Sequence, residues 1–584
     1  MLWLFTVLAV ASVGPTLRAE LHILHTNAQL THIEEFNAGG KTCSDIDVQA
    51  ERCYAGVARR MTAIENIRSV VRDSVLLDAG DTLTGTDWYA VFRGQESAHF
   101  MNSLDYTALS LGQYDFIHGT ETVLSFLQNT TFPSLGCNIN ITDEPGFTDH
   151  LLPSIVKNMS DGERVGIVGY SDDSIPDTFR TGQLIFDDVI SAMQDEVARL
   201  EFEGVNRIIA LGFGSTELHK LVVEEVVGVD VIVYGGPKTL LHNGVPEAPE
   251  DENIVAGDYP MVMNPGYDPN VTVLLVSAYK WGKYLGHLNV SFDEDGKVVD
   301  WTGNTLLMKT SIQQDADVLS EVTEWKEELN EGLAREIGQT HVLLDASAET
   351  CYLHECNFQS LLMDAVVHYY AKRGHRDISM AIVNADSYDN YINETGSGTV
   401  TLGDLRSVML YWETMDVVEL GGRYIREAFE RSVEEYDGEK PIRYFLQVSG
   451  VRVTYDISKP AGQRVKEVLV NCATCRVPEY KPLDDDAVYK FATNSYLASG
   501  GSGYGMIGDN RLSHVIGEEQ TDDILEEYIR AISPVRLGVE GRITFDSSNG
   551  GSECMDPISG AIWLADINIS LVILSLAYAI CTTQ

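Results

Sequence analysis

Short apolar runs alternate with longer helical stretches through the first half of this 584-residue chain. The runs are rich in β-branched residues, which is typical of buried strands. They lie at residues 21–24, 75–77, 108–111, 165–168, 207–210 and 229–233. Between them, residues 57–71 and 190–202 repeat apolar positions at helical spacing. This order predicts a layered α/β fold, in which ligand sites gather at the loops that leave the strands.

The pattern changes at residues 315–339. Val318, Val322, Trp325, Leu329 and Leu333 recur at helical spacing, with Glu and Lys between them. The simplest interpretation is one helix that links an N-terminal domain, residues 20–314, to a second α/β domain, residues 340–546. The alternative is a helix packed wholly within one domain.

The N-terminus carries the pattern of a secretory signal. Residues 2–13 are apolar and small residues follow near Ala19, which predicts a signal peptide over residues 1–19. An N-terminal membrane anchor is the alternative, but the apolar run is short for a bilayer. We therefore expect an extracellular protein.

The C-terminus predicts a lipid anchor. Small residues at 547–552, a polar spacer and an apolar tail at 569–581 follow the order of a GPI-attachment signal over residues 547–584. We place the attachment site at Asn549, with Ser559 as the alternative. A single spanning helix is the other interpretation, but Asp566 and Asn568 interrupt the apolar run and no basic cluster follows it. The sequence thus predicts a protein that is secreted or anchored at the outer face of the plasma membrane.

Two further features suit an extracellular chain. Six N-x-S/T sequons precede the tail and predict surface glycans. They are Asn129, Asn140, Asn158, Asn270, Asn289 and Asn393. Nine cysteines predict disulfides, and three pairs lie close together in the sequence. These pairs are Cys43 with Cys53, Cys351 with Cys356, and Cys472 with Cys475.

The chain is strongly acidic. Asp and Glu number 87 against 41 Lys and Arg, which gives a formal net charge of −46. Such a surface repels phosphate backbones, so we expect no nucleic-acid partner. Solubility is the simplest role of this charge.

Several motifs occur together in both predicted domains. In the first they are LHILHTN at 21–27, GVAR at 56–59 and LLDAGD at 76–81. In the second they are ECN at 355–357, YFLQVSG at 444–450, CATCRVP at 472–478 and LASGGSG at 497–503. With these motifs the chain resembles the secreted and GPI-anchored 5'-nucleotidase/apyrase family.

The resemblance implies an N-terminal calcineurin-like, four-layer metallophosphoesterase domain. It also implies a linking helix and a C-terminal α/β 5'-nucleotidase domain that sets nucleotide specificity. Members of the family hydrolyse nucleotides with two divalent metals, usually zinc, and many form homodimers through the C-terminal domain. A homodimer of this kind is therefore an expectation for this chain.

The metal-binding positions that the resemblance assigns depart from the family pattern. Asp81 matches the retained bridging ligand. Other metal ligands are replaced at Ala28, Leu30, Gln113, Phe213 and Gly236, the catalytic His at Tyr114, and the Asp that orients it at Ile117. Two dications held close together need several carboxylate and imidazole ligands, so we expect no bound metal cofactor and no metal-dependent hydrolysis.

An active enzyme is the alternative to this expectation. Other residues in or beside the same loops would then have to rebuild a two-zinc site. The candidates are His25, His32, Asp78, Asp115 and His118. For each of them a structural role is the simpler interpretation.

The nucleotide side of the resemblance is partly kept. Tyr411 and Tyr496 match an aromatic pair that stacks a base, and Asn384 matches a substrate-contacting Asn. Two phosphate-binding arginines and a ribose-binding Asp are replaced, at Tyr352, Asp389 and Ser502. We therefore expect a nucleoside rather than AMP if the clamp binds at all. The alternative is two tyrosines at an empty domain interface.

Together these observations predict a cell-surface binding or scaffold protein with a nucleoside or a protein as its ligand. An active ecto-5'-nucleotidase or apyrase is the alternative.

Overall fold

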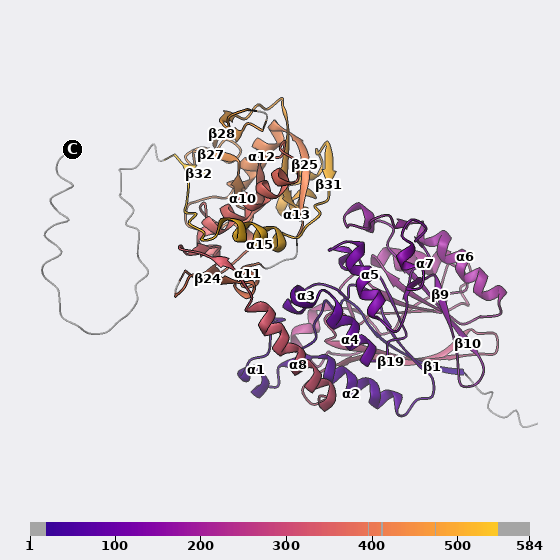
Figure 1. Ribbon diagram of the computed structural model, residues 1–584. Coiled ribbons are helices and arrows are strands. Elements are labelled where there is room, and N and C mark those ends of the chain that lie inside the picture. The colour runs from indigo at the N-terminus through magenta and orange to yellow at the C-terminus, as the bar shows by residue number, and fades with distance from the viewer. Residues whose placement is uncertain (1–18, 395, 410–412, 474, 547–584) are drawn as a thin grey trace, which may run out of the picture.

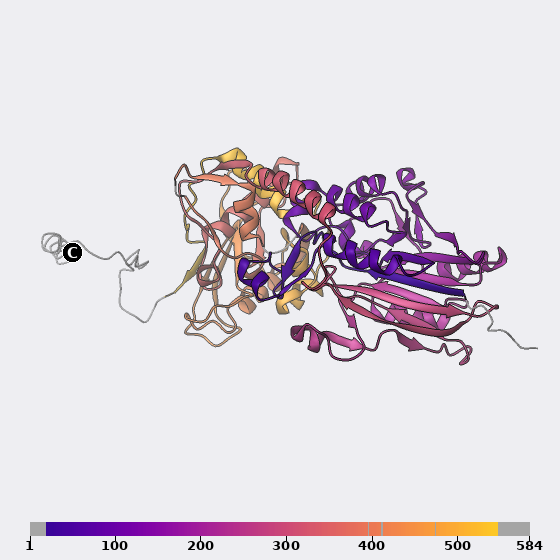
Figure 2. The same cartoon turned by 90° about the horizontal axis from the view of Figure 1, so that it is seen from below.

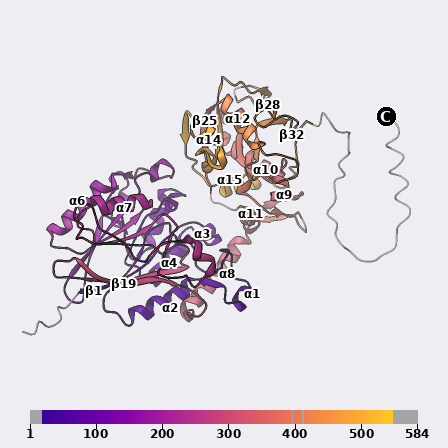
Figure 3. The same cartoon turned by 180° about the vertical axis from the view of Figure 1, so that it is seen from behind.

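The computed structural model describes residues 19–394, 396–409, 413–473 and 475–546. They form two domains that lie side by side, with α8 (Ala316–Leu333) running between them (Figures 1 and 3). Tyr411, Asn549 and the predicted GPI signal lie outside the described residues, as does all but the last residue of the predicted signal peptide. In the described part of the chain, no helix is long and apolar enough to cross a membrane.

Two β-sheets form the centre of the N-terminal domain. The first has the order β19 (Val298–Leu307), β18 (Tyr284–Phe292), β1 (Ala19–Thr26), β4 (Ser74–Asp78), β5 (Ala108–Ser110), β6 (Ser134–Leu135) and β8 (Leu151–Leu152). The second has the order β16 (Met261–Met263), β17 (Val273–Val276), β13 (Val231–Gly235), β12 (Ile208–Phe213), β10 (Arg164–Ser171) and β9 (Ser154–Asn158). All six strands expected from the apolar runs are confirmed.

The pleat of these strands explains the layers. On β1, Ile23 belongs to the apolar core that β10, β12 and β13 also build, while Leu24 belongs to the core on the opposite face. That opposite face is covered by α2 (Val57–Arg68), α4 (Gln95–Ser103) and α5 (Thr120–Asn129). The second sheet carries α6 (Val189–Phe202) and α7 (Thr216–Glu225). Helix, sheet, sheet and helix make four layers (Figure 2).

The linking helix is shorter than predicted. Helix α8 ends at Leu333, and residues 336–339 form strand β20 (Glu336–Gln339) instead of the last helical turn. The prediction was wrong there because β20 pairs with β24 (Thr399–Thr401), a partner that local periodicity cannot reveal. The helix packs on α2 and α3 (Asp87–Phe92) of the first domain and on α11 (Leu402–Val408) of the second.

The C-terminal domain also has two sheets. The five-stranded sheet has the order β26 (Leu446–Ser449), β22 (Ala381–Asn384), β30 (Val488–Asn494), β25 (Met415–Gly421) and β31 (Ser513–Val515). The four-stranded sheet has the order β29 (Tyr480–Pro482), β28 (Val465–Asn471), β27 (Val451–Tyr455) and β32 (Ile543–Phe545). One apolar core includes residues of both sheets and of α10 (Asn357–Lys372), α12 (Gly422–Ser432) and α15 (Thr521–Ile532).

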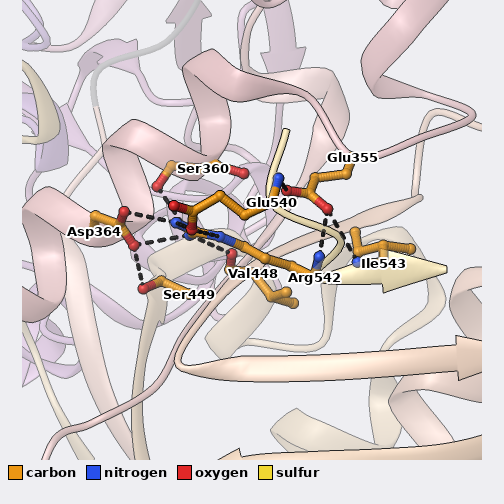
Figure 4. Close-up of polar contacts among 8 residues, drawn as sticks. All are labelled: Glu355, Ser360, Asp364, Val448, Ser449, Glu540, Arg542 and Ile543. Carbon is orange, nitrogen blue, oxygen red and sulfur yellow. Dashed lines mark hydrogen bonds and ion pairs between the residues drawn. The ribbon is translucent and has the colours of Figure 1, made fainter. Parts of the chain in front are cut away.

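Arg542 fixes the last strand to the rest of the domain (Figure 4). Its guanidinium donates two hydrogen bonds to the Asp364 carboxylate, at 2.8 and 2.7 Å, and a third to Glu540 at 2.9 Å. The Glu355 carboxylate accepts from the backbone N–H groups of Glu540, Arg542 and Ile543. The chain is therefore held on both sides where β32 begins.

Polar contacts also join the two domains near the start of α15. Arg93 of the first domain makes a 2.9 Å ion pair with Asp523. The Gln520 side-chain amide donates to the Ile117 carbonyl oxygen at 3.0 Å, and Arg180 donates to the carbonyl oxygen of Glu518. These contacts and α8 together fix how the domains face each other.

The structure tests the predicted disulfides and shows how exposed the predicted glycosylation sites are. The three cysteine pairs expected from the sequence form disulfides, with Cα–Cα distances of 6.0, 5.1 and 5.4 Å. Five of the six sequon asparagines are exposed, whereas Asn289 is half-buried within β18. Strand packing therefore makes Asn289 the least accessible of the six predicted sites.

Candidate functional site

The strand-end loops singled out by the sequence meet at one edge of the N-terminal domain. The loop after β1 runs along the loop after β4 through backbone hydrogen bonds from Ala28 to Gly80 at 2.8 Å and from Leu30 to Asp81 at 3.1 Å. Ala28 and Leu30 are both buried, with 1% and 8% of their surface exposed. Their apolar side chains offer nothing to a cation.

Asp81 is buried at the centre of these loops. One carboxylate oxygen, Oδ1, accepts from the backbone N–H of Tyr114 at 2.9 Å. The other, Oδ2, has no hydrogen-bond partner within the described residues. Burial, and then the nearby negative charge of Asp115, raise the pKa of Asp81 well above its usual range. Asp81 is therefore an orphaned buried acid.

Asp115 has a structural role beside Asp81. Its carboxylate accepts backbone N–H groups from Asp81, Thr82, Leu83 and Gly112, at 3.1, 2.8, 2.9 and 2.7 Å. Burial raises the pKa of Asp115 to about 6 even so. All of these bonds hold the two loops together, so Asp115 is committed to the loop structure.

Packing atoms fill the space around Asp81. The Phe213 ring lies so close to Gly80 and Gly112 that a Cβ on either glycine would come within 3.1 and 2.8 Å of it. Gly236 takes φ +110°, and a Cβ there would lie 2.0 Å from the Gly214 carbonyl oxygen. Phe213 therefore offers no donor atom to a cation, and a side chain at position 236 would clash with the Gly214 carbonyl oxygen.

The histidines that could substitute as metal ligands have other partners. His25 Nε2 lies 2.8 Å from the Tyr259 hydroxyl, and His32 Nδ1 lies 2.9 Å from the Leu30 carbonyl oxygen. The His118 ring packs 4.8 Å from that of Tyr89. Burial lowers the pKa of His25 to about 3, that of His32 to about 4 and that of His118 to about 3.

Asp78 is also engaged by its own loops. Its carboxylate accepts from Thr26 at 2.6 Å, Gln29 at 2.8 Å, Thr82 at 2.9 Å and the Gly80 N–H at 3.1 Å. Burial raises its pKa. Asp78 therefore satisfies local donors and does not turn toward Asp81 as a second ligand.

These residues do not fit a two-metal centre. Across the described ranges, the only three His, Cys, Asp or Glu side chains whose ligand atoms converge are Glu35, Cys43 and Cys53. The two cysteines of that group form a disulfide. Around Asp81 the donor set is reduced to one free carboxylate oxygen, whereas two dications need several anionic or imidazole ligands.

A cavity of about 610 Å³ opens between the domains, next to the Asp81 loops. Gln113, Tyr114 and Ile117 line it from the first domain, and Asn384 and Tyr496 line it from the second. We call it the interdomain cavity. The resemblance assigned six positions to catalysis or nucleoside binding; five of them line this cavity, and the sixth, Tyr411, lies outside the described residues.

Three positions that the resemblance assigned to phosphate or ribose binding do not line this cavity. Tyr352 is buried, and Asp389 accepts the Ala348 N–H at 3.2 Å on another surface. Ser502 lies beside Tyr496, where its N–H donates to the tyrosine hydroxyl at 3.1 Å. The residues that replace the phosphate-binding arginines therefore do not line the interdomain cavity.

Sequence reasoning missed Glu413, Asp386 and Arg180, which also line the cavity. Asn494 donates to Glu413 and to Asn384, both at 3.0 Å, and thereby joins two residues of the wall. Burial raises the pKa of Glu413 to about 7. The one sequence signal for Glu413 was its position, two residues after the predicted base-stacking tyrosine at 411.

Comparison with known proteins agrees with the fold and the motifs. The model of the 5'-nucleotidase C-terminal domain matches residues 336–509. The mouse 5'-nucleotidase is 39% identical over 540 residues, which cover 91% of each chain, and the human one is 38% identical over 92% of each chain. The chain belongs to the 5'-nucleotidase family.

Solved structures of this family support the two-domain fold. The 5'-nucleotidase precursor from Thermus thermophilus is 28% identical, with a TM-score of 0.58, and covers 91% of this chain and 100% of its own. The NAD nucleotidase of Haemophilus influenzae shares the fold, with a TM-score of 0.68 at 19% identity and coverage of 91% and 100%. The predicted α/β fold, a metallophosphoesterase domain followed by a 5'-nucleotidase domain, is confirmed.

Proposed function

We propose that this chain is an extracellular, non-hydrolytic member of the 5'-nucleotidase family that acts by binding a ligand or partner at the cell surface. The observation that carries the proposal is the environment of Asp81. Among the described residues, no group of three His, Cys, Asp or Glu ligand atoms converges at Asp81, and the Phe213 ring packs against its loops. Without a bound metal there is no Lewis acid and no activated hydroxide.

The predicted termini support the cellular location in this proposal. A signal peptide would direct the chain out of the cell, and a GPI signal would anchor it there. Homodimer formation through the C-terminal domain remains a prediction.

Hydrolysis of AMP, ADP or ATP is the second candidate function. Relatives that carry the name 5'-nucleotidase are 38–39% identical over more than nine-tenths of the chain, which favours a phosphoric ester hydrolase. This candidate requires two divalent metals, such as zinc, and therefore a rearrangement that brings new ligands to Asp81.

A nucleoside is one ligand that the proposed binding function could take. Tyr496 and Asn384 line the interdomain cavity, and an aromatic face can stack any base. Tyr411, the other predicted clamp residue, lies outside the described residues. Adenosine binding that is weakened by Tyr496→Ala would support this version.

Phosphate release tests the main proposal. The purified protein, supplied with AMP or ATP and zinc, is expected to release no phosphate above the protein-free control. Elemental analysis is expected to find less than one zinc ion per chain, because one carboxylate oxygen cannot hold two dications. A family member with confirmed activity serves as the positive control.

The Asp81→Ala variant separates the two candidate functions. Under the proposal it behaves like the unmodified protein in both assays. Phosphate release that this variant abolishes would establish the hydrolase and overturn the proposal.

A further inference from the structure

The interdomain cavity combines aromatic and acidic walls. Phe179 and Tyr496 present rings to it, from different domains, and Asp386 and Glu413 present carboxylates from the second domain. A cavity of several hundred Å³ with a few convergent polar groups has the dimensions of a small-molecule site. The chemistry of these walls indicates what kind of molecule fits.

The two carboxylates are close enough to influence each other. The negative charge of Asp386 adds to burial in raising the pKa of Glu413 to about 7. Glu413 accepts hydrogen bonds from Asn494 at 3.0 Å and Ser387 at 3.3 Å, and Asp386 accepts one from Asn384. All of these donors are neutral side chains, and both carboxylates are half-buried.

No arginine, lysine or histidine of the described residues lies within ion-pair distance of Asp386 or Glu413. Arg180 lines the same cavity, but its guanidinium donates to the carbonyl oxygen of Glu518. Among the described residues, no cation therefore pairs with these two carboxylates. A phosphate next to them would add a third negative charge at short range.

We propose that the interdomain cavity binds an organic cation, an aromatic amine or ammonium compound. Its charged nitrogen lies by Asp386 and Glu413, and its ring packs on the aromatic side chains that line the cavity. A cation pairs with both carboxylates, and aromatic walls attract ammonium groups through their π faces. The inference rests on the proposed function in one respect, because only the proposed function excludes a nucleotide phosphate from this cavity.

Three indoles of nearly equal size test the role of charge. Tryptamine is a cation, tryptophol is its neutral alcohol analogue, and indole-3-acetate is an anion. Titration calorimetry on the purified protein at pH 8 is expected to show tryptamine binding about tenfold more tightly than tryptophol, a difference of about 1.4 kcal/mol. Binding of indole-3-acetate is expected to be weaker still.

Substitutions of the two carboxylates test whether they are the groups that bind the cation. Asp386→Asn and Glu413→Gln are each expected to remove most of the preference for tryptamine over tryptophol. Glu331→Gln, which changes an exposed carboxylate on α8, is the matched control and should keep it. Tryptamine binding should also tighten between pH 6 and pH 8 as Glu413 loses its proton, because the amine stays charged throughout.

Equal affinity for the three indoles, a preference for the anion, or no binding of tryptamine would overturn the inference. So would retention of the charge preference in both cavity variants. Thermal melting checks that the variants fold, and if they do not, the comparison of ligands on the unmodified protein decides. Tighter binding of adenosine than of tryptamine would overturn the amine but not the loss of hydrolysis. Asp81-dependent phosphate release would overturn the proposed function and the exclusion of nucleotides from the cavity, while the comparison of the three indoles would still decide whether an amine binds.

Discussion

Replacing Arg542 by methionine is expected to lower the free energy of unfolding of the C-terminal domain by about 1.5–3 kcal/mol, because the change removes the charge-assisted hydrogen bonds of a buried guanidinium to the partly exposed Asp364 carboxylate. Only 7% of Arg542 is exposed, and its guanidinium binds Asp364 in a two-pronged ion pair. The same group also donates to the Ser360 and Val448 carbonyl oxygens. Urea denaturation followed by circular dichroism measures the loss.

Arg426→Met is the matched control for this prediction. Arg426 makes a 2.8 Å ion pair with Asp485, and the two side chains are 34% and 52% exposed, so removal is expected to cost about 0–1 kcal/mol. The double variant Arg542→Met with Asp364→Leu should recover much of the lost stability, since an apolar pair leaves no isolated charge. Equal effects of the two arginine variants would contradict this account.

Replacing Asp81 by asparagine is expected to raise the melting temperature of the N-terminal domain at pH 8, because the change removes a buried charge whose pKa is raised well above its usual range. Asparagine keeps an acceptor for the Tyr114 N–H and tolerates the left-handed backbone at this position, where φ is 58°. If Asp81 were a metal ligand, the same substitution would lower the stability of the protein, because it would cost metal binding and the stability that comes with it.

The pH dependence of this effect follows from the raised pKa of Asp81. A carboxyl with a raised folded pKa keeps its full contribution to stability below its unfolded pKa, near 4, and loses that contribution as pH rises through the folded pKa. The advantage of Asp81→Asn should therefore shrink toward pH 4 and grow toward pH 8. Differential scanning fluorimetry across this range measures it.

Asp115→Asn is the control variant, because it removes a carboxylate charge from a neighbouring residue of the same loops. The Asp115 carboxylate accepts four backbone N–H groups, and an amide, with a single acceptor oxygen, cannot accept them all. This variant should melt at a lower temperature than the unmodified protein. A lower melting temperature for Asp81→Asn as well, together with stabilisation of the unmodified protein by added zinc, would favour the hydrolase.

The sequence predicted the strands of the first domain because burial on both faces leaves a continuous apolar pattern in each of them. It also identified Asp81 and the altered loop positions. It could not predict that residues 336–339 leave the helix, since β20 depends on a partner more than sixty residues away. Nor could it place Asp386 and Glu413 in one cavity, because only the packing of the second domain brings these loops together.

The walls of the interdomain cavity come from both domains, so any ligand that touches both walls acts as an allosteric effector of their arrangement. Such a ligand would favour the domain arrangement described here, the closed form, over any arrangement that separates the two walls, by as much as it binds the closed form better. The reverse also holds, since weakening the contact between Arg93 and Asp523 would reduce the closed population and the apparent affinity together. Domain closure and occupancy of the cavity are then two readouts of a single equilibrium.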